Sequence, residues 1–264
     1  MSTSAIYQHP LAYLIGLEGV ALLRGFAGDY DREFVEARLA EVCALLDSGP
    51  PGDALLVDPV SVPDGYDGWS RDYDEPGNGL IDPEEPIVRE MLAGLPVGVA
   101  LDAACGTGRP TGHLVSLGHR TIGVDSSPAM LAKARAKVPS AEFHQGDLHR
   151  LPVPDDHVDV VVCALALTHV RDLAPVLAEF ARPGGHLVIS DSRVFMITAS
   201  RYPLVKPGPD GQPGYIPGWH HESSDYLAAA PHCRTDSRCV VASSPVSPTW
   251  WIPLARPNRS RPVR

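Results

Sequence analysis

The sequence lacks several of the signals that assign a protein to a broad class at once. Its five cysteines form no CxxC pair and have no metal-ligand spacing: Cys43, Cys105, Cys163, Cys233 and Cys239. Their odd number and the missing secretory signal lead us to expect reduced thiols and a cytoplasmic protein. The formal net charge of −10 argues against nucleic-acid binding, because such a surface requires clustered Lys and Arg.

A long apolar run is missing as well. The most apolar stretch near the N-terminus, Leu11 to Leu23, contains Glu18 and follows no basic residue. It is too short to span a bilayer and makes a poor signal peptide, so we expect no membrane partner. The 264 residues, 44% of them hydrophobic, suffice for one domain of generous size with a real core.

The most informative stretch runs from Val99 to Asp125, VALDAACGTGRPTGHLVSLGHRTIGVD. A short apolar strand ends on Asp102, and a tight turn with Gly106 and Gly108 follows. A helix then leads to a second strand, which ends on Asp125. The glycines allow close backbone approach, and the free N–H groups of the helix face the turn. This order predicts a ligand crevice at the carboxyl ends of parallel strands.

The residues of this crevice favour one ligand over others. A dinucleotide fingerprint needs a third glycine where Thr111 stands, and the Gly-Lys-Ser/Thr of a P-loop is absent. The carboxylate of Asp102 would repel a pyrophosphate but suits a cationic amine. A ligand with a ribose for Asp125 and an ammonium group near Asp102 fits S-adenosylmethionine better than NAD.

The segments LDAACGTG, IGVD, GDL and RPGG together resemble the class I SAM-dependent methyltransferases. Within this family the chain is similar to the methyltransferase type 11-like, actinobacterial small-molecule branch, over roughly Leu80 to Asp191. The resemblance implies O-, N- or C-methylation of a small organic acceptor with S-adenosyl-L-methionine as cofactor, in secondary metabolism. Ala104 departs from the family pattern, which usually has its first glycine there.

The alternation of strands and helices predicts an α/β fold with a doubly wound, mostly parallel sheet, the Rossmann-like methyltransferase fold. We expect strands at 97–101, 121–124, 141–144, 157–165 and 186–190, and helices at 83–92, 109–117, 129–137 and 172–181. Residues 1–68 are predicted to form a helical extension with a linker, and 69–230 the methyltransferase core. The core includes an acceptor-pocket insertion at about 193–223, and 231–264 form an atypical Arg/Pro-rich tail.

The two ends of the chain leave alternatives open. Residues 10–48 predict two helices, the second capped by Asp31, which form a lid, the arm of a homodimer, or a plain packing pair of a monomer. In the tail, 238–242 and 249–254 have the character of closing antiparallel strands. We favour the other interpretation, a disordered or loosely packed tail from a shifted reading frame.

The resemblance also implies roles for the cofactor-binding residues. Asp102 and the backbone of the glycine turn would hold the methionine part, and Asp125 would accept both ribose hydroxyls. Strand-end capping is the alternative for Asp125 and Asp147. The full predicted set is Asp102, Ala104, Cys105, Gly106, Gly108, Asp125, Ser126, Met130, Asp147, Leu148 and Ala164.

Candidate acceptor-site residues lie in three segments. His169 could take a proton from a hydroxyl or amine, or it could be a structural histidine. Tyr73, in WSRDYDEP, is the tyrosine we expect across the cofactor, although Trp69 and Tyr73 could also be core anchors. Further acceptor contacts are expected from Trp69, Thr168, Tyr215, Trp219 and His221. We predict no metal site, since the adjacent His220 and His221 would point opposite ways in a strand.

Two other functions compete with small-molecule methylation. RNA or protein methylation is disfavoured by the negative charge and by CALAL, which stands where an Asn/Asp-Pro-Pro-aromatic signature would follow the fourth strand. The remaining alternative is a SAM-binding scaffold or regulatory pseudo-methyltransferase, which the unusual tail and a shortened helix before Arg182 keep open. Turnover would separate it from an enzyme.

Overall fold

The computed structural model divides the chain into two compact units. The described residues are 4–49, 52–76, 78, 80–182, 185–191, 204–208, 210–230, 240–243 and 248–253. One unit comprises Ser2–Pro59, and the other Val60–Arg264 together with Met1. The division between the two units falls after Pro59, so helix α3 (Val62–Trp69), which the sequence did not predict, belongs to the larger unit.

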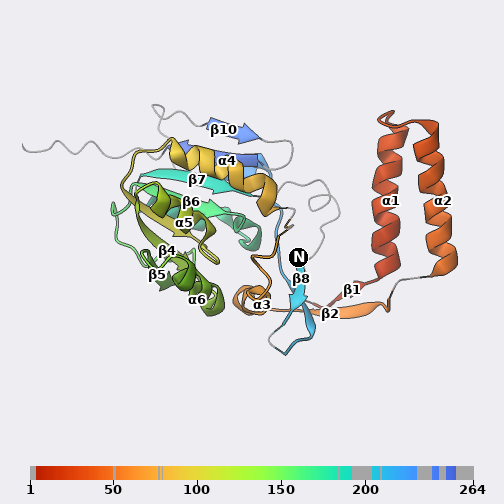
Figure 1. The fold of residues 1–264 in the computed structure, drawn as a ribbon, viewed down its shortest axis with the longest axis horizontal. Helices are drawn as coiled ribbons and strands as arrows, with labels where there is room; N and C mark the ends of the chain where they lie inside the picture. Colours follow the sequence, from red (N-terminus) through yellow and green to blue (C-terminus); the bar gives the residue numbers. More distant parts are fainter. Residues whose placement is uncertain are drawn as a thin grey trace, which may run out of the picture. The chain divides into compact units, whose positions relative to one another are not determined.

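The smaller unit is a helical hairpin with a two-stranded ribbon (Figure 1). β1 (Ile6–Gln8) pairs antiparallel with β2 (Leu55–Pro59). The two predicted helices are α1 (Pro10–Phe26) and α2 (Arg32–Ser48), and they pack against each other. Asp31 caps α2 as predicted, since its carboxylate accepts the N–H of Phe34 at 2.9 Å.

Neither helix of this hairpin contains a buried residue. Within the described part of the chain, no helix has both the length and the apolar character needed to cross a membrane.

The larger unit is built on a sheet with the strand order β10-β11-β7-β6-β3-β4-β5. The five strands from β7 to β5 are parallel, as the sequence predicts, and β11 and β10 continue the sheet in antiparallel fashion. The strands are β3 (Val99–Ala103), β4 (Arg120–Asp125), β5 (Glu142–Gln145), β6 (Val160–Ala164), β7 (His186–Ser190), β10 (Val240–Ser243) and β11 (Pro248–Pro253).

Apolar side chains fill both faces of this sheet. Alternate residues of β6 point to opposite faces, so Val160 and Val162 join one cluster while Val161 and Cys163 join the other. The first cluster includes α4 (Ile81–Ala93) and α5 (Arg109–Ser116), and the second includes α7 (Leu173–Ala181) and α9 (Ser223–Ala229). α6 (Pro128–Lys137) packs on β4 and β5. A doubly wound sheet therefore has its core on two sides.

Local sequence signals place these core elements correctly. Ser127 and Asp172 cap α6 and α7, because their side chains accept the N–H groups of Met130 and Ala174 at 3.1 Å each. The glycine turn lies between β3 and α5, and Gly108 precedes the first residue of α5 with φ of 84°. The five strands and four helices predicted between 83 and 190 agree with the structure within a few residues.

Regular structure also occurs where the sequence predicted a linker or a loop. The expected linker contains β2 and most of α3, and the expected insertion contains the antiparallel pair β8 (Leu204–Pro207) and β9 (Pro213–Ile216). α3 packs on both of these strands, and Gly65 lies so close to Ile216 that a Cβ would approach its side chain to 2.4 Å. Abundant Pro, Gly and Asp concealed these elements, because their order depends on packing and not on local pattern.

The C-terminal stretch follows the alternative that we did not favour. β10 and β11 pair with each other, and β11 pairs with β7 from Thr249↔Ser190 to Pro253↔His186. The prediction of a disordered or loosely packed tail is therefore wrong for these residues. The remaining parts of the predicted insertion and tail, 192–203, 209, 231–239, 244–247 and 254–264, lie outside the described residues.

Candidate functional site

The glycine turn after β3 holds its shape through backbone bonds to β4. Ala104, Gly106 and Gly108 all have positive φ, at 62°, 54° and 84°. The N–H of Cys105 donates to the carbonyl of Val124 at 2.9 Å, so the turn is tied to the neighbouring strand. A Cβ placed on Gly106 would meet no atom within 4 Å, so this glycine faces open space.

Asp125, at the end of β4, organises the turn from the other side. Its Oδ2 accepts the N–H of Gly106 at 2.8 Å, and its Oδ1 accepts the N–H of Ser127 at 2.9 Å. Burial raises the pKa of Asp125, and these backbone hydrogen bonds oppose the shift. Each carboxylate oxygen keeps a further lone pair for a ligand donor.

Asp102 lies buried beneath the turn. Its Oδ2 accepts the hydroxyl of Thr111 at 2.6 Å, whereas its Oδ1 has no hydrogen-bond partner among the described residues. Burial raises the pKa of Asp102 to about 7, although the Thr111 bonds and the nearby Arg109 favour the charged form. An unpaired buried carboxylate oxygen is costly, which makes it a candidate for a cationic partner.

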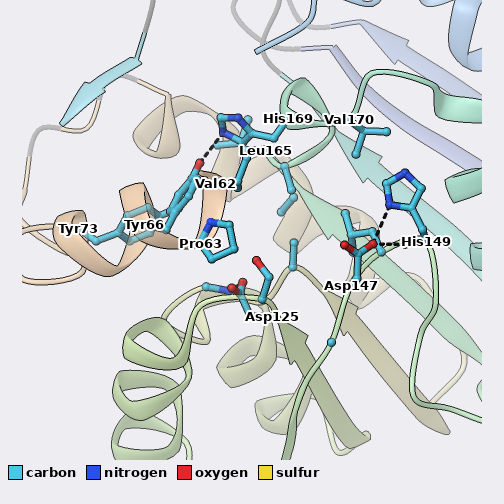
Figure 2. A pocket seen from close by; sticks show the side chains of 17 residues that line it. Val62, Pro63, Tyr66, Tyr73, Asp125, Asp147, His149, Leu165, His169 and Val170 are labelled. Atoms are coloured by element: carbon cyan, nitrogen blue, oxygen red, sulfur yellow. Dashed lines mark hydrogen bonds and ion pairs between the residues drawn. The ribbon is translucent and has the colours of Figure 1, made fainter. Parts of the chain in front are cut away.

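A cavity of about 180 Å³ opens at the carboxyl ends of β3, β4, β5 and β6 (Figure 2). Of the described residues that line it, Asp125 and Asp147 are the carboxylates, and none is Lys or Arg. The lining consists of Val62, Pro63, Tyr66, Tyr73, Ala104, Gly106, Asp125, Ser126, Gly146, Asp147, Leu148, His149, Ala164, Leu165, Ala166, His169 and Val170.

α3 forms one wall of this cavity and is fastened to α6. The carboxylate of Asp67 accepts the Ser127 hydroxyl and, at 3.1 Å, the N–H of Ala129. This contact fixes α3 against the N-terminus of α6 and points Tyr66 into the cavity (Figure 2). Tyr73 lies next to it, with its ring centroid 6.2 Å from that of Tyr66. Burial raises the pKa of Tyr73 to about 12.

His169 lies on the opposite wall, in the short 3-10 helix η1 (Leu167–His169). Its Nε2 is 2.8 Å from the hydroxyl of Tyr66 (Figure 2). Its Nδ1 is 3.0 Å from the carbonyl oxygen of Pro217. A carbonyl oxygen only accepts, so Nδ1 carries the proton and Nε2 accepts the Tyr66 O–H. Burial lowers the pKa of His169, so the ring is neutral at ordinary pH.

The segment from Pro217 to His221 holds η1 in place. The N–H of Trp219 donates to the carbonyl of Thr168 at 2.6 Å, and the Thr168 hydroxyl donates to the carbonyl of Trp219 at 3.2 Å. His221 donates from Nε2 to the carbonyl of Val170 at 2.7 Å. These predicted acceptor contacts therefore lie behind the cavity wall and fix the position of His169.

Asp147 and Leu165 add two further features to the cavity. Asp147 accepts both the backbone N–H and the Nδ1–H of His149, each at 2.7 Å (Figure 2). Partial burial raises the pKa of Asp147, but the two hydrogen bonds outweigh it and the net shift is downward. Leu165 has φ of 56°, an uncommon conformation for a bulky residue and one that is typical of functional sites.

The structure thus brings together one part of the predicted set. Lining the cavity are His169, Tyr73, Ala104, Gly106, Asp125, Ser126, Asp147, Leu148 and Ala164. Outside the lining are Asp102, Cys105, Gly108, Met130, Trp69, Thr168, Tyr215, Trp219 and His221. Trp69 instead packs on Tyr73 and beneath the ammonium group of Lys206, which is 3.7 Å from the ring centroid.

Sequence reasoning missed Tyr66, His149 and the apolar residues Val62 and Pro63 of α3, which complete the wall. Tyr66 stands in SVPDGYDG, which we assigned to a linker. The only local signal is Ser61, followed three residues later by Asp64. The Ser61 side chain accepts the Asp64 N–H at 3.2 Å as the N-cap of α3.

Comparison with known proteins gives several matches. The family model described as "Methyltransferase domain" matches residues 101–189. Isonocardicin synthase of Nocardia uniformis subsp. tsuyamanensis is 32% identical over 210 residues, which are 72% of this chain and 68% of that protein. Trans-aconitate 2-methyltransferase of Azoarcus sp. is 35% identical over 138 residues, 49% of this chain and 54% of that protein.

Other relatives are matched over a smaller part. The chain spans 36% of the length of a probable S-adenosylmethionine-dependent methyltransferase of Mycolicibacterium smegmatis, with 37% identity over 93 residues, 34% of this chain. Among solved structures, a DhpI–SAH complex superposes with a TM-score of 0.55 and 26% identity, over 72% of this chain and 94% of that one.

Proposed function

Because the chain belongs to the class I S-adenosylmethionine-dependent methyltransferases, we propose that it methylates a small organic acceptor bound in the cavity between α3 and η1. The observation that carries this proposal is the shared wall formed by Gly106 and Asp125. These two residues present open backbone and a carboxylate to the same cavity that Tyr66 and His169 line from the acceptor side.

The residues around the glycine turn fit S-adenosylmethionine. Because residue 106 is glycine, no side chain fills the open space beyond it, and the cofactor can approach the backbone there. The unpartnered Oδ1 of Asp102 suits the ammonium group of the methionine part. Asp125 has lone pairs for two ribose hydroxyls. Asp147, with Leu148 beside it, is proposed to take the adenine amino group.

On the acceptor side the chain supplies positioning and a proton acceptor. The cofactor supplies a methyl group that is already activated on a sulfonium, so no covalent nucleophile from the protein is needed. The protein has to hold the acceptor in line and exclude water. His169 is neutral and is proposed as the general base, and Tyr73 contributes a ring face and a protonated phenol.

We further assign the reaction to secondary metabolism, on the resemblance described above, and to the cytoplasm, on the cysteine content and the missing secretory signal. For the N-terminal hairpin, which has no buried residue in either helix, a lid, a dimer arm and a plain packing pair all stay open.

The test begins with calorimetric titration of the protein with S-adenosylmethionine and S-adenosylhomocysteine. Asp125→Ala should weaken the binding of both by about 1–3 kcal/mol, the scale of a charge-assisted hydrogen bond. Asp172→Ala is the matched control, because it also removes a carboxylate that accepts a backbone N–H, at the start of α7. Its dissociation constants should equal those of the wild type.

Turnover then separates an enzyme from a scaffold. A methyltransferase releases S-adenosylhomocysteine and gives a product heavier by one methylene group, measured by mass spectrometry. Binding that survives in Asp125→Ala would contradict the ribose assignment. Tight cofactor binding without any product, over a broad acceptor panel, would support the scaffold alternative. A different mass increment would contradict methyl transfer, a relevant outcome because one relative is named a synthase.

A further inference from the structure

We infer that Tyr66 and His169 form a proton relay, with Tyr66 as the group that touches the acceptor, and that the acceptor is a neutral hydroxyl compound, not a carboxylate. The inference rests on the proposed function. It deepens that function by naming the acceptor class and a catalytic residue, Tyr66, that the sequence did not reveal.

The first step of the argument is the direction of the two hydrogen bonds. Pro217 fixes the proton of His169 on Nδ1, so Nε2 can only accept, and the 2.8 Å contact uses the O–H of Tyr66. Tyr66 therefore donates its hydroxyl proton to Nε2 of His169. Towards the cavity the Tyr66 oxygen offers lone pairs alone, and these recognise an O–H donor.

The second step is the charge of the cavity. The described lining contains the carboxylates Asp125 and Asp147 and no Lys or Arg that could pair with a bound anion. A carboxylate acceptor would place its negative oxygen against the lone pairs of Tyr66 and near Asp125, which lies close enough to raise the pKa of Tyr66. A neutral hydroxyl avoids this repulsion and donates to Tyr66.

The third step is the proton balance. Methylation of a hydroxyl forms a carbon–oxygen bond and breaks the carbon–sulfur bond, whose electron pair stays on sulfur, and one proton is released. The acceptor proton passes to the Tyr66 oxygen while the Tyr66 proton passes to Nε2 of His169. The product of this step is a neutral tyrosine and an imidazolium ion that still donates from Nδ1 to Pro217.

The surroundings favour this concerted order. The titratable groups near Tyr66 are Tyr73 after α3, Asp125 at the end of β4 and Asp191 after β7. Together with burial they raise the pKa of Tyr66, so a free tyrosinate is avoided. His169 has its pKa lowered by burial and is uncharged before the reaction. The relay should therefore lose activity as pH falls and the ring becomes protonated.

The test has one readout that does not depend on activity. Two-bond ¹H–¹⁵N spectra of the full-length protein, labelled with ¹⁵N-histidine, should show that the ring proton of His169 is on Nδ1. His119 is the internal control, because its Nδ1 accepts the N–H of Gly98 at 3.2 Å and its proton must be on Nε2. Tyr66→Phe should shift the Nε2 signal of His169 and leave both tautomers unchanged.

The second readout is turnover of matched acceptors. Phenols should be methylated and benzoates with the same ring substituents should not. Tyr66→Phe and His169→Gln should each lower kcat by about 10²-fold or more, and the fall of kcat at acid pH should be absent from both. His119→Gln, which alters a buried histidine at the other end of the sheet, should change neither kcat nor its pH dependence.

Three results would overturn the inference. They are a proton on Nε2 of His169, a Tyr66→Phe spectrum identical to that of the wild type, and preferential methylation of the benzoates. Calorimetry with S-adenosylmethionine distinguishes these failures from failure of the proposed function, because cofactor binding does not involve the Tyr66–His169 bond. Intact binding with the wrong tautomer refutes the relay alone.

Discussion

Replacing Asp102 by asparagine should stabilise the cofactor-free protein at neutral and alkaline pH. This carboxylate is buried, accepts one hydrogen bond from Thr111 and leaves Oδ1 without a partner among the described residues. Burial raises its pKa from 3.8 to about 7. The native protein therefore binds this proton more tightly than the unfolded chain does.

The size of the effect follows from linkage. The difference between 3.8 and about 7 corresponds to a free energy on the order of 4 kcal/mol, since a tenfold change in proton affinity is worth about 1.4 kcal/mol. Below about pH 4 the carboxyl is protonated in both states and its contribution is fully present. The free energy of unfolding then falls as pH rises to about 7, because ionisation is opposed only in the native state.

Asp102→Asn removes this dependence. The stability of the variant minus that of the wild type should increase by up to about 4 kcal/mol between pH 4 and pH 8. Urea unfolding at half-unit pH intervals measures it. Glu179→Gln is the control of opposite sign, because hydrogen bonds from Arg182 lower the pKa of Glu179. Glu179→Gln should lower the free energy of unfolding at pH 7, and this loss should shrink as pH falls below 4.5.

The same substitution should weaken the binding of S-adenosylmethionine, since the variant has no charge for the ammonium group. Calorimetry at pH 8 gives this value on the same samples. A difference in stability that does not change with pH would refute the reasoning about burial. Unchanged cofactor affinity would refute the pairing of Asp102 with the ammonium group.

Three further substitutions test the backbone. Ala104→Gly should raise the free energy of unfolding by about 0.5–1 kcal/mol. The strain of alanine at φ of 62° costs more free energy than the extra entropy that glycine gives the unfolded chain. Urea unfolding measures the change, and a loss of stability would contradict the prediction. Gly185→Ala should abolish folding as judged by circular dichroism, since its Cβ would lie 2.2 Å from the carbonyl oxygen of Asp159. Gly211→Ala, with similarly positive φ but no atom within 4 Å, should fold and lose only about 1–2 kcal/mol.

In the site, as in the fold, local patterns predicted the residues beside recognisable strands and missed the residues that packing positions. Gly106, Asp125 and Asp147 could be predicted because each lies at the end of a strand, or within three residues after it, and the local pattern reveals that strand. Tyr66 could not, because the residues around it are rich in Pro, Gly and Asp and have no clear period. His169 was identified as a candidate, but its tautomer depends on Pro217, which is 48 residues away.

The sequence by itself determined the family, the parallel sheet from β3 to β7, the helix cap Asp31 and the glycine turn after β3. Each of these depends on residues within one turn or one strand, where backbone sterics and neighbouring hydrogen bonds decide the conformation. Only the tertiary structure decided that α3 belongs to the core unit and that Tyr66 meets His169, 103 residues later. Such a contact requires two distant segments to be fixed by packing, and no local pattern of side chains encodes their distance.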